Sequence, residues 1–192
     1  MESEAGLVER RVFGGPVELF LLRHGEAEQA SAWTDAGRPL SGRGRESINE
    51  AARAMSLLGL QFELILSSPL VRAIETAEIV REKTGSRCEI PRTDALLPDS
   101  SLRKVYPSVA SSLFLLDTPD TPRAGPLRVL LVGHQPLLGE LCADLMGQEA
   151  AVSFGKGMLV HFELGEVPPR RSRLKEVYSL TRLLSLAEQG LP

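Results

Sequence analysis

The chain has 192 residues, of which 43% are hydrophobic and 24% are charged, and its formal net charge is -3 at pH 7. This length and composition are typical of one soluble globular domain with a sizeable hydrophobic core. The slightly acidic balance argues against a nucleic-acid-binding protein, and no apolar run is long enough to cross a membrane.

The N-terminal residues 1–15 are rich in charge and end in two glycines, so we expect a flexible leader. They contain no apolar segment of the kind that directs secretion, which predicts a cytoplasmic protein. The two cysteines, Cys88 and Cys142, form no metal-binding pair, and we expect both to be reduced thiols. Nothing in the chain requires a disulfide or a zinc site.

The first part of the chain alternates between short apolar runs and segments with helical periodicity. The run at 17–22 predicts a buried strand, and the small polar residues of 26–40 predict a loop. A helix is expected from the capping residue Ser41 to a stop at Gly59. A second buried strand is expected at 62–68.

Prolines make the middle of the chain harder to assign. We expect a helix between Pro69 and Gly85 and a short strand at 88–90. The stretch 91–126 predicts a loop, then a helix at 101–116, then a linker.

The last third returns to a clear alternation of strands and helices. A buried strand is expected at 128–134, and a helix from Pro136 to Gly147. Alternating residues at 157–164 predict another strand, and 174–180 predict one more, with a terminal helix after it.

Strands that alternate with helices of this length predict an α/β domain with a mainly parallel sheet. In such sheets ligands bind outside the carboxyl ends of the strands. Two of the predicted strands end in a histidine, His24 and His134, so position as well as residue type indicates a site. We expect residues 1–192 to form a single domain and leave the role of a C-terminal extension, 165–192, open.

Four side chains would converge at this edge of the sheet: Arg23, His24, Arg72 and His134. Arginine forks match phosphate oxygens and keep their charge at every relevant pH. A neutral imidazole can attack phosphorus, and a second imidazole can stabilise charge in the transition state. The residues therefore predict phosphoryl transfer that needs no metal ion or other cofactor.

Three motifs extend this pattern, namely LFLLRHGEAE (19–28), SSPLVRAIETAEIV (67–80) and VLLVGHQPLLGEL (129–141). With RPLSGRGRESINEAARAM and SFGKGML, they resemble the histidine phosphatase superfamily, and within it the SixA-type branch of phosphohistidine phosphatases. The resemblance covers roughly 17–164 and implies a phosphoglycerate mutase-like fold, a three-layer α/β/α sandwich.

The resemblance also implies roles for the residues of the motifs. His24 would be the nucleophile that becomes phosphorylated, and Arg23 and Arg72 would bind the phosphate. His134 would contact the phosphoryl group and stabilise its transfer, and Gly25 would let the backbone approach the phosphate closely. The implied mechanism has two steps, in which phosphorylated His24 is formed and then hydrolysed by water.

A general acid is harder to identify. The family usually has a glutamate after the third strand, whereas here ALLPDSSLRK offers only Asp99. Its position after a proline equally predicts an ordinary turn residue. The SixA-type branch often lacks a well-placed acid, and the nitrogen that leaves a phosphoramidate is protonated readily.

We expect the substrate to be phosphohistidine on a protein, for example on a histidine phosphotransfer domain of a signalling relay. Little of the chain outside 91–126 is available for a lid, and an open site suits a protein substrate. A small-molecule phosphomonoesterase or mutase of the same fold is an alternative, which would need a deep pocket and an acid near Asp99. A non-catalytic phospho-binding protein is a second alternative, but it would have lost the nucleophile or an arginine.

Three further residues allow two interpretations each. Lys156 either lies at the edge of the pocket and attracts phosphate or is an ordinary surface lysine. Trp33 either flanks the mouth of the site or covers the edge of the core. His161 lies within an alternating strand, and we expect a structural role for it.

Overall fold

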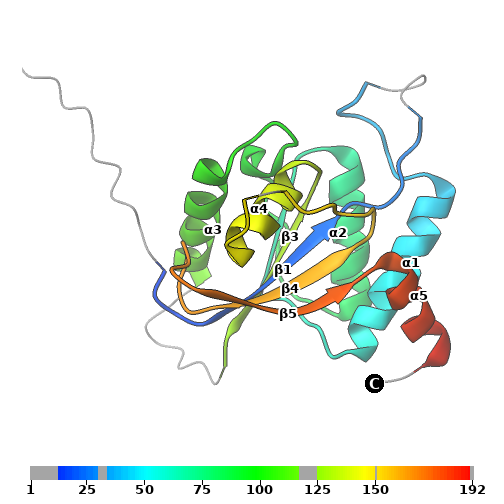
Figure 1. The fold of residues 1–192 in the computed structure, drawn as a ribbon. Coiled ribbons are helices and arrows are strands. Elements are labelled where there is room, and N and C mark those ends of the chain that lie inside the picture. Colours follow the sequence, from blue (N-terminus) through cyan, green and yellow to red (C-terminus); the bar gives the residue numbers. More distant parts are fainter. Residues whose placement is uncertain (1–12, 30–33, 117–124, 150, 191–192) are drawn as a thin grey trace, which may run out of the picture.

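The computed structural model describes residues 13–29, 34–116, 125–149 and 151–190 (Figure 1). Its strands form one five-stranded sheet in the order β2-β3-β1-β4-β5. The strands are β1 (Val17–Arg23), β2 (Leu64–Ser67), β3 (Leu127–Gly133), β4 (Leu159–Leu164) and β5 (Ser172–Tyr178). The helices are α1 (Gly42–Leu57), α2 (Val71–Thr84), α3 (Leu102–Leu116), α4 (Leu137–Met146) and α5 (Leu180–Gln189), and a short 3₁₀ helix, η2, spans Asp94–Leu96.

The sheet is parallel on one side and antiparallel on the other. Strand β3 pairs in parallel with both β1 and β2. Strand β4 runs antiparallel to β1, and β5 runs antiparallel to β4. Four of the five strands therefore point the same way, which confirms the predicted α/β fold and its mainly parallel sheet.

Helices cover both faces of the sheet, so the molecule has three layers (Figure 1). Side chains of β1 alternate between the two hydrophobic cores that result. Leu19 and Leu21 pack in the core with α3 and α4, whereas Phe20 and Leu22 pack in the core with α1, α2 and α5. All four side chains are buried, which explains why 19–22 is an uninterrupted apolar run in the sequence.

Helix ends follow the local chemistry that the sequence predicts. The Ser41 side chain accepts a hydrogen bond from the Gly44 N–H and so caps α1. Gly85 and Gly147 follow α2 and α4 with φ of 66°, the left-handed conformation that glycine adopts without strain. The expected helix at 101–116 is also present, as α3.

One predicted element is wrong, because residues 88–90 do not form a strand. Beyond this segment, the chain pairs with the outer edge of β2 at a single-residue bridge between Ser67 and Arg92. The Ser67 N–H donates to the Pro91 carbonyl, and Pro91 itself has no N–H with which to extend a ladder. Apolar character at 88–90 thus reflects partial packing against the sheet rather than pairing with it.

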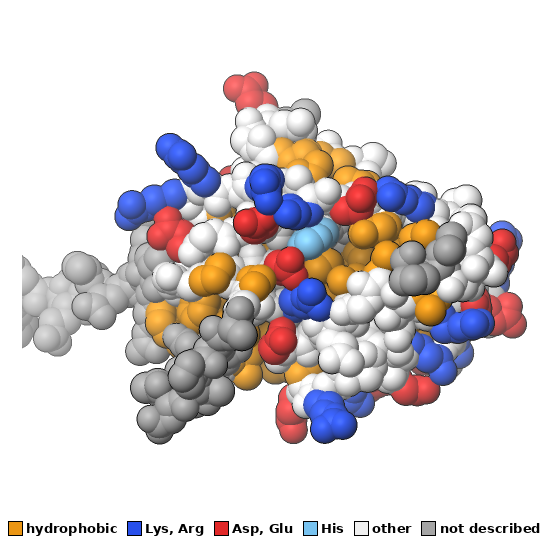
Figure 2. Space-filling model, turned by 90° about the horizontal axis from the view of Figure 1, so that it is seen from below, with side chains coloured by type: hydrophobic (Ala, Val, Ile, Leu, Met, Phe, Trp, Pro, Cys, Tyr) orange, Lys and Arg blue, Asp and Glu red, His pale blue; other side chains and the backbone are white. Residues whose placement is uncertain are grey.

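Residues of the C-terminal extension complete the sheet and one helical layer. Strand β5 is the edge strand beside β4, and buried Leu183 of α5 packs in the core that α1 shares. Ion pairs such as Arg173–Glu163 link the two strands. Basic and acidic side chains are interspersed on the face shown in Figure 2. Within the described ranges, no helix is long and apolar enough to cross a membrane, and Cys88 and Cys142 are free thiols.

Candidate active site

The four predicted site residues meet at the carboxyl end of the parallel strands. Arg23 ends β1 opposite Gly133 of β3, and the His24 N–H donates to the Gly133 carbonyl at 3.2 Å. Arg72 comes from the first turn of α2. The residues enclose a small pocket of about 290 Å³. It is lined by Arg23, His24, Ala27, Arg38, Arg72, His134, Gln135 and Lys156.

The imidazole of His24 is held with one nitrogen fixed. Its Nδ1 atom lies 2.6 Å from the Gly25 carbonyl oxygen, which can only accept, so Nδ1 carries the proton. The Nε2 atom of the neutral ring therefore keeps a free lone pair. Burial lowers the pKa of His24 to about 4, with the hydrogen bond to Gly25 opposing the shift and the charges of Arg72 and Arg23 adding to it. The His24 imidazole is therefore neutral at neutral pH, and its Nε2 atom has the lone pair that a nucleophile needs.

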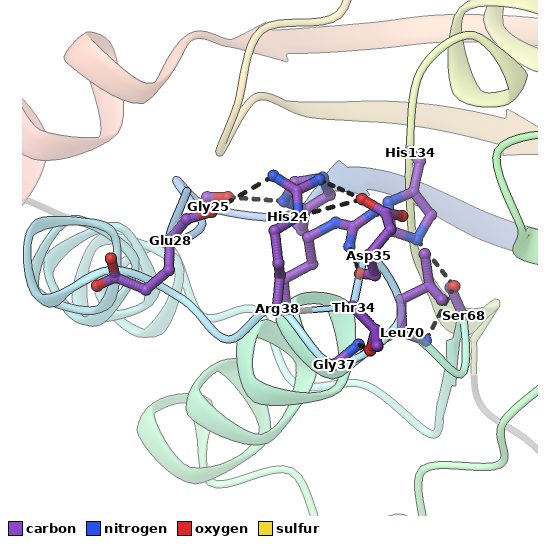
Figure 3. Close-up of polar contacts among 11 residues, drawn as sticks. His24, Gly25, Glu28, Thr34, Asp35, Gly37, Arg38, Ser68, Leu70 and His134 are labelled. Carbon is purple, nitrogen blue, oxygen red and sulfur yellow. Dashed lines mark hydrogen bonds and ion pairs between the residues drawn. The ribbon is translucent and has the colours of Figure 1, made fainter. Parts of the chain in front are cut away.

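His134 is the second neutral imidazole of the pocket. Its ring centroid lies 4.8 Å from that of His24, and its Nε2 atom lies 2.8 Å from the Ser68 hydroxyl (Figure 3). Burial lowers the pKa of His134 to about 3, helped by His24 and Arg72. Its Nδ1 atom is buried and has no hydrogen-bond partner within the described part of the chain. A buried polar atom without a hydrogen bond lowers the stability of the folded protein unless a ligand contacts it.

Two guanidinium groups supply fixed positive charge. Arg72 is only 4% exposed, and its Nη1 donates to the Asp35 carbonyl oxygen at 2.7 Å. Arg23 Nη1 donates to the Phe154 carbonyl oxygen at 2.7 Å. The Nε atoms of both arginines are buried, and neither has a hydrogen-bond partner in the described ranges. These groups can bind an anion while their positions stay fixed by backbone contacts.

Gly25 is required by packing on the side away from the pocket. A Cβ atom at this position would lie 2.6 Å from Ile48 Cγ1 of α1. The Gly25 N–H donates to the Thr76 hydroxyl at 3.2 Å, which ties the residue after His24 to α2. The glycine thus allows the loop to press against α1 and α2 while the His24 ring faces the pocket.

The other sequence candidates occupy different places. Asp99 is exposed in a turn after η2 and is not among the residues that line the pocket. Lys156 does line it and lies 3.7 Å from a carboxylate oxygen of Glu26. His161 stacks on Phe20, with ring centroids 4.1 Å apart, and lies outside the pocket. Trp33 lies outside the described residues.

Sequence reasoning missed several polar residues of the site. Ser68 contacts His134, whereas Asp35 and Arg38 contact each other and lie beside Arg72. Gln135 also lines the pocket and accepts a hydrogen bond from the Gly139 N–H. The available signals were places in or beside the quoted motifs, since Arg38 opens RPLSGRGRESINEAARAM, Ser68 lies in the SSPLVRA motif and Gln135 directly follows His134. No group of three or more His, Cys, Asp or Glu side chains in the described parts of the chain is arranged to hold a metal ion.

Comparison with known proteins gives a consistent picture. Residues 19–97 match the family described as the histidine phosphatase superfamily (branch 1). An uncharacterized protein of a Picosynechococcus strain is 36% identical over 126 residues, which are 65% of this chain and 70% of that protein. Phosphohistidine phosphatase SixA of Escherichia coli is 28% identical over 150 residues, which are 78% of this chain and 87% of SixA.

Solved structures share the fold. A protein histidine phosphatase SixA complexed with tungstate aligns with a TM-score of 0.71 and 24% identity, over 87% of this chain and 99% of that one. A phosphoglycerate mutase from Bacillus anthracis aligns with a TM-score of 0.62 and 16% identity, over 95% and 99% of the two chains. The phosphoglycerate mutase-like fold implied by the motifs is thereby confirmed.

Proposed function

The chain belongs to the histidine phosphatase superfamily and is a phosphatase, and from this premise we propose that it hydrolyses phosphohistidine on a protein substrate. We further propose that the reaction uses a phosphorylated His24 intermediate and needs no metal ion. The observation that carries the proposal is the state of His24, a neutral imidazole whose Nε2 keeps its lone pair and which shares a small pocket with Arg23 and Arg72.

The first chemical step would be attack by His24 Nε2 on the phosphorus of the substrate. A new N–P bond forms at His24, and the bond between phosphorus and the leaving group breaks. The guanidinium groups of Arg23 and Arg72 would bind the equatorial oxygens and offset their charge. His134, whose ring lies beside that of His24, would contact the phosphoryl group from the other side.

In the second step, water would attack the phosphorus of phosphorylated His24. The N–P bond breaks, the imidazole regains its free Nε2, and orthophosphate is released. The Gly25 carbonyl holds the proton on Nδ1 through both steps, so that Nε2 remains the reacting atom. Guanidinium groups provide the charge that a metal ion supplies in other phosphatases.

Two observations support a phosphoramidate as the substrate. The residues that line the pocket in the described part of the chain are cations, imidazoles, Ala27 and Gln135, and the carboxylates of Asp35 and Glu26 beside it are each paired with a cation of the lining. The nitrogen that leaves a phosphoramidate picks up a proton readily, whereas an alkoxide leaving group needs a general acid. Similarity to SixA, over most of both chains, points the same way.

The size of the pocket favours a phosphorylated side chain. A volume of about 290 Å³ accommodates a phosphoryl group and an imidazole, but it is at the lower limit for sites that enclose whole small molecules. The partner would then be a protein such as a histidine phosphotransfer domain, reached from the open side. A cytoplasmic location stays a prediction from the sequence.

A small-molecule phosphomonoesterase is the second candidate. It is favoured by a partial match to a 2,3-bisphosphoglycerate-dependent phosphoglycerate mutase of Parvibaculum lavamentivorans, 38% identical over 87 residues. That match covers 42% of this chain and 40% of the mutase. Under this alternative an acid must come from outside the pocket lining, and Asp99 is the residue to test.

The two candidates separate in a matched substrate assay. Hydrolysis of a phosphohistidine protein and of phosphoramidate is compared with hydrolysis of a panel of phosphate monoesters, with and without a chelator. The proposal expects faster P–N than P–O cleavage, no effect of the chelator, and no activity in His24→Ala. Faster ester hydrolysis that falls in Asp99→Asn would favour the second candidate. A loss of activity with the chelator would overturn metal independence.

A further inference from the structure

The carboxylate of Asp35 is bound by two arginines of the pocket. Its Oδ1 accepts hydrogen bonds from Arg38 Nε at 3.1 Å and Arg38 Nη2 at 2.5 Å. Its Oδ2 accepts from Arg72 Nη2 at 3.2 Å. Figure 3 shows these contacts beside His24 and His134. A carboxylate thus contacts Nη2 of Arg72, one of the donors that this guanidinium offers to a bound phosphoryl group.

The two partners of this ion pair differ in how firmly they are held. The Arg72 side chain is 5% exposed, whereas the Asp35 side chain is 62% exposed at the mouth of the pocket. Arg72 is held by α2 and by the backbone carbonyl of Asp35. The carboxylate is charged at neutral pH, because hydrogen bonds from Arg38 and the charge of Arg72 lower its pKa. Because the Asp35 end of the pair is exposed to water, which weakens the attraction, a more strongly charged anion can compete with it for Arg72.

We propose that Asp35 is the resident anion of the substrate-free site and that the phosphoryl group of the substrate displaces its carboxylate from Arg72. The inference rests on the proposed function, in which Arg72 binds the phosphoryl group. Because a carboxylate and a phosphoryl group repel each other, they do not share Arg72 Nη2. Asp35 therefore determines how strongly the site binds anions.

Displacement has two consequences for the catalytic cycle. Arg38 lines the same pocket, so the departure of the carboxylate frees a third guanidinium for the substrate. After hydrolysis, the returning carboxylate competes with orthophosphate for Arg72. Asp35 thus weakens the binding of the product as well as the binding of the substrate, which keeps product release fast.

The side chain of Asp35 can be tested apart from its backbone. The backbone carbonyl, which accepts from Arg72 Nη1, is kept in Asp35→Asn and Asp35→Ala. Glu28→Gln is the matched control, since it removes one negative charge from the same loop and its side chain points away from the arginines in Figure 3. Binding of inorganic phosphate is measured by calorimetry, and steady-state kinetics give kcat and KM.

Both Asp35 variants are expected to bind phosphate about 3- to 10-fold more tightly than wild type, with a lower KM and slower product release, while Glu28→Gln stays near wild type. Unchanged or weaker phosphate binding in the Asp35 variants would overturn the inference. If the Asp35 variants fail in this way but the wild type binds phosphate and Arg72→Ala does not, the role of Asp35 is wrong and the proposed function still stands. If neither the wild type nor the Asp35 variants bind phosphate, the proposed function fails as well.

Discussion

The imidazole rings of His24 and His134 lie 4.8 Å apart, at an angle of 54°, on two loops that leave parallel neighbouring strands. Neither ring contacts a carboxylate of the described residues, and each has a pKa far below that of a free histidine. The pair is thus kept neutral beside two arginines. This combination leaves a nucleophilic nitrogen available while the positive charge of the pocket comes from guanidinium groups.

Neutral histidines make the protein less stable in mild acid. Unfolded histidine binds a proton below about pH 6.5, whereas folded His24 does so only below about 4. Since the unfolded state binds more protons in this window, stability falls as the pH drops from about 6.5 to 4 and levels off below. Each of the two pocket histidines should lower the free energy of unfolding by about 2 kcal/mol between pH 8 and pH 5.

Urea unfolding at the two pH values measures this effect. The difference in unfolding free energy between pH 8 and pH 5 should be smaller in His134→Gln than in the wild type, because only one histidine with a lowered pKa then remains in the pocket. His161→Gln serves as a comparison outside the site, since the pKa of His161 is also lowered by burial but the residue lies away from the pocket. A wild type equally stable at pH 5 and pH 8 would show that the pocket histidines titrate normally.

Replacing the guanidinium group of Arg72 by an ammonium group should impair catalysis, although the positive charge is kept. Lysine offers a single ammonium group, which cannot bind two phosphoryl oxygens side by side. We expect Arg72→Lys to lower kcat/KM by about 100-fold, as for the loss of one strong transition-state donor. The exposed Arg53 of α1 provides the control, since Arg53→Lys should leave kinetics unchanged. Near-normal kcat/KM in Arg72→Lys would argue against a forked contact.

Ser68 should act as a positioning residue for His134. Its buried hydroxyl lies 2.8 Å from His134 Nε2, so its loss leaves that nitrogen unpartnered and the ring free to rotate. We expect Ser68→Ala to lower kcat about tenfold with a smaller change in KM, and to change the pH profile. Ser67→Ala is the control, because the Ser67 hydroxyl is also buried but donates to the Ser68 carbonyl instead. Equal effects of the two substitutions would indicate a merely structural hydroxyl.

The loop after His24 depends on a close approach to α1. A Cβ atom on Gly44 would lie 2.0 Å from the Glu26 carbonyl oxygen, whereas one on Gly42 would meet nothing within 4 Å. Gly44→Ala should therefore destabilise the protein by about 1–3 kcal/mol and reduce activity. Gly42→Ala, two residues away on the same helix, should be neutral or slightly stabilising. Thermal unfolding of the pair distinguishes steric crowding from a general loss of glycine flexibility, which would affect both.

Most of the fold could be predicted because the central strands are largely apolar. Strands β1 and β3 are buried on both faces over 19–22 and 129–132, and each of these apolar stretches is followed by the polar residues of the site. The strand predicted at 88–90 is wrong because the apolar residues of this segment pack beside β2 without pairing with it. An apolar composition indicates that a segment is buried, but pairing with a neighbouring strand also requires N–H groups that are free and in register.

The site was only partly predictable. His24 and His134 could be found because each directly follows a strand, and Arg72 because it starts the helix after one. Asp35 and Arg38 come from a loop whose position over the pocket depends on contacts with α2, such as the Val71 N–H to the Ala36 carbonyl. Nothing in the local pattern of that loop indicates this placement. Conversely, Asp99 has a suitable side chain but lies exposed in a turn.

Direct detection of a phosphorylated His24 tests the mechanism best. Wild-type enzyme is mixed with phosphoramidate or a phosphohistidine protein, quenched within one turnover under alkaline conditions that preserve N–P bonds, and mapped by mass spectrometry. We expect one phosphoryl group on His24, formed without added metal, decaying at the rate of turnover and absent in His24→Ala. Turnover with no phosphorylated enzyme, or with the phosphoryl group on another residue, would contradict the assignment of His24 as the nucleophile.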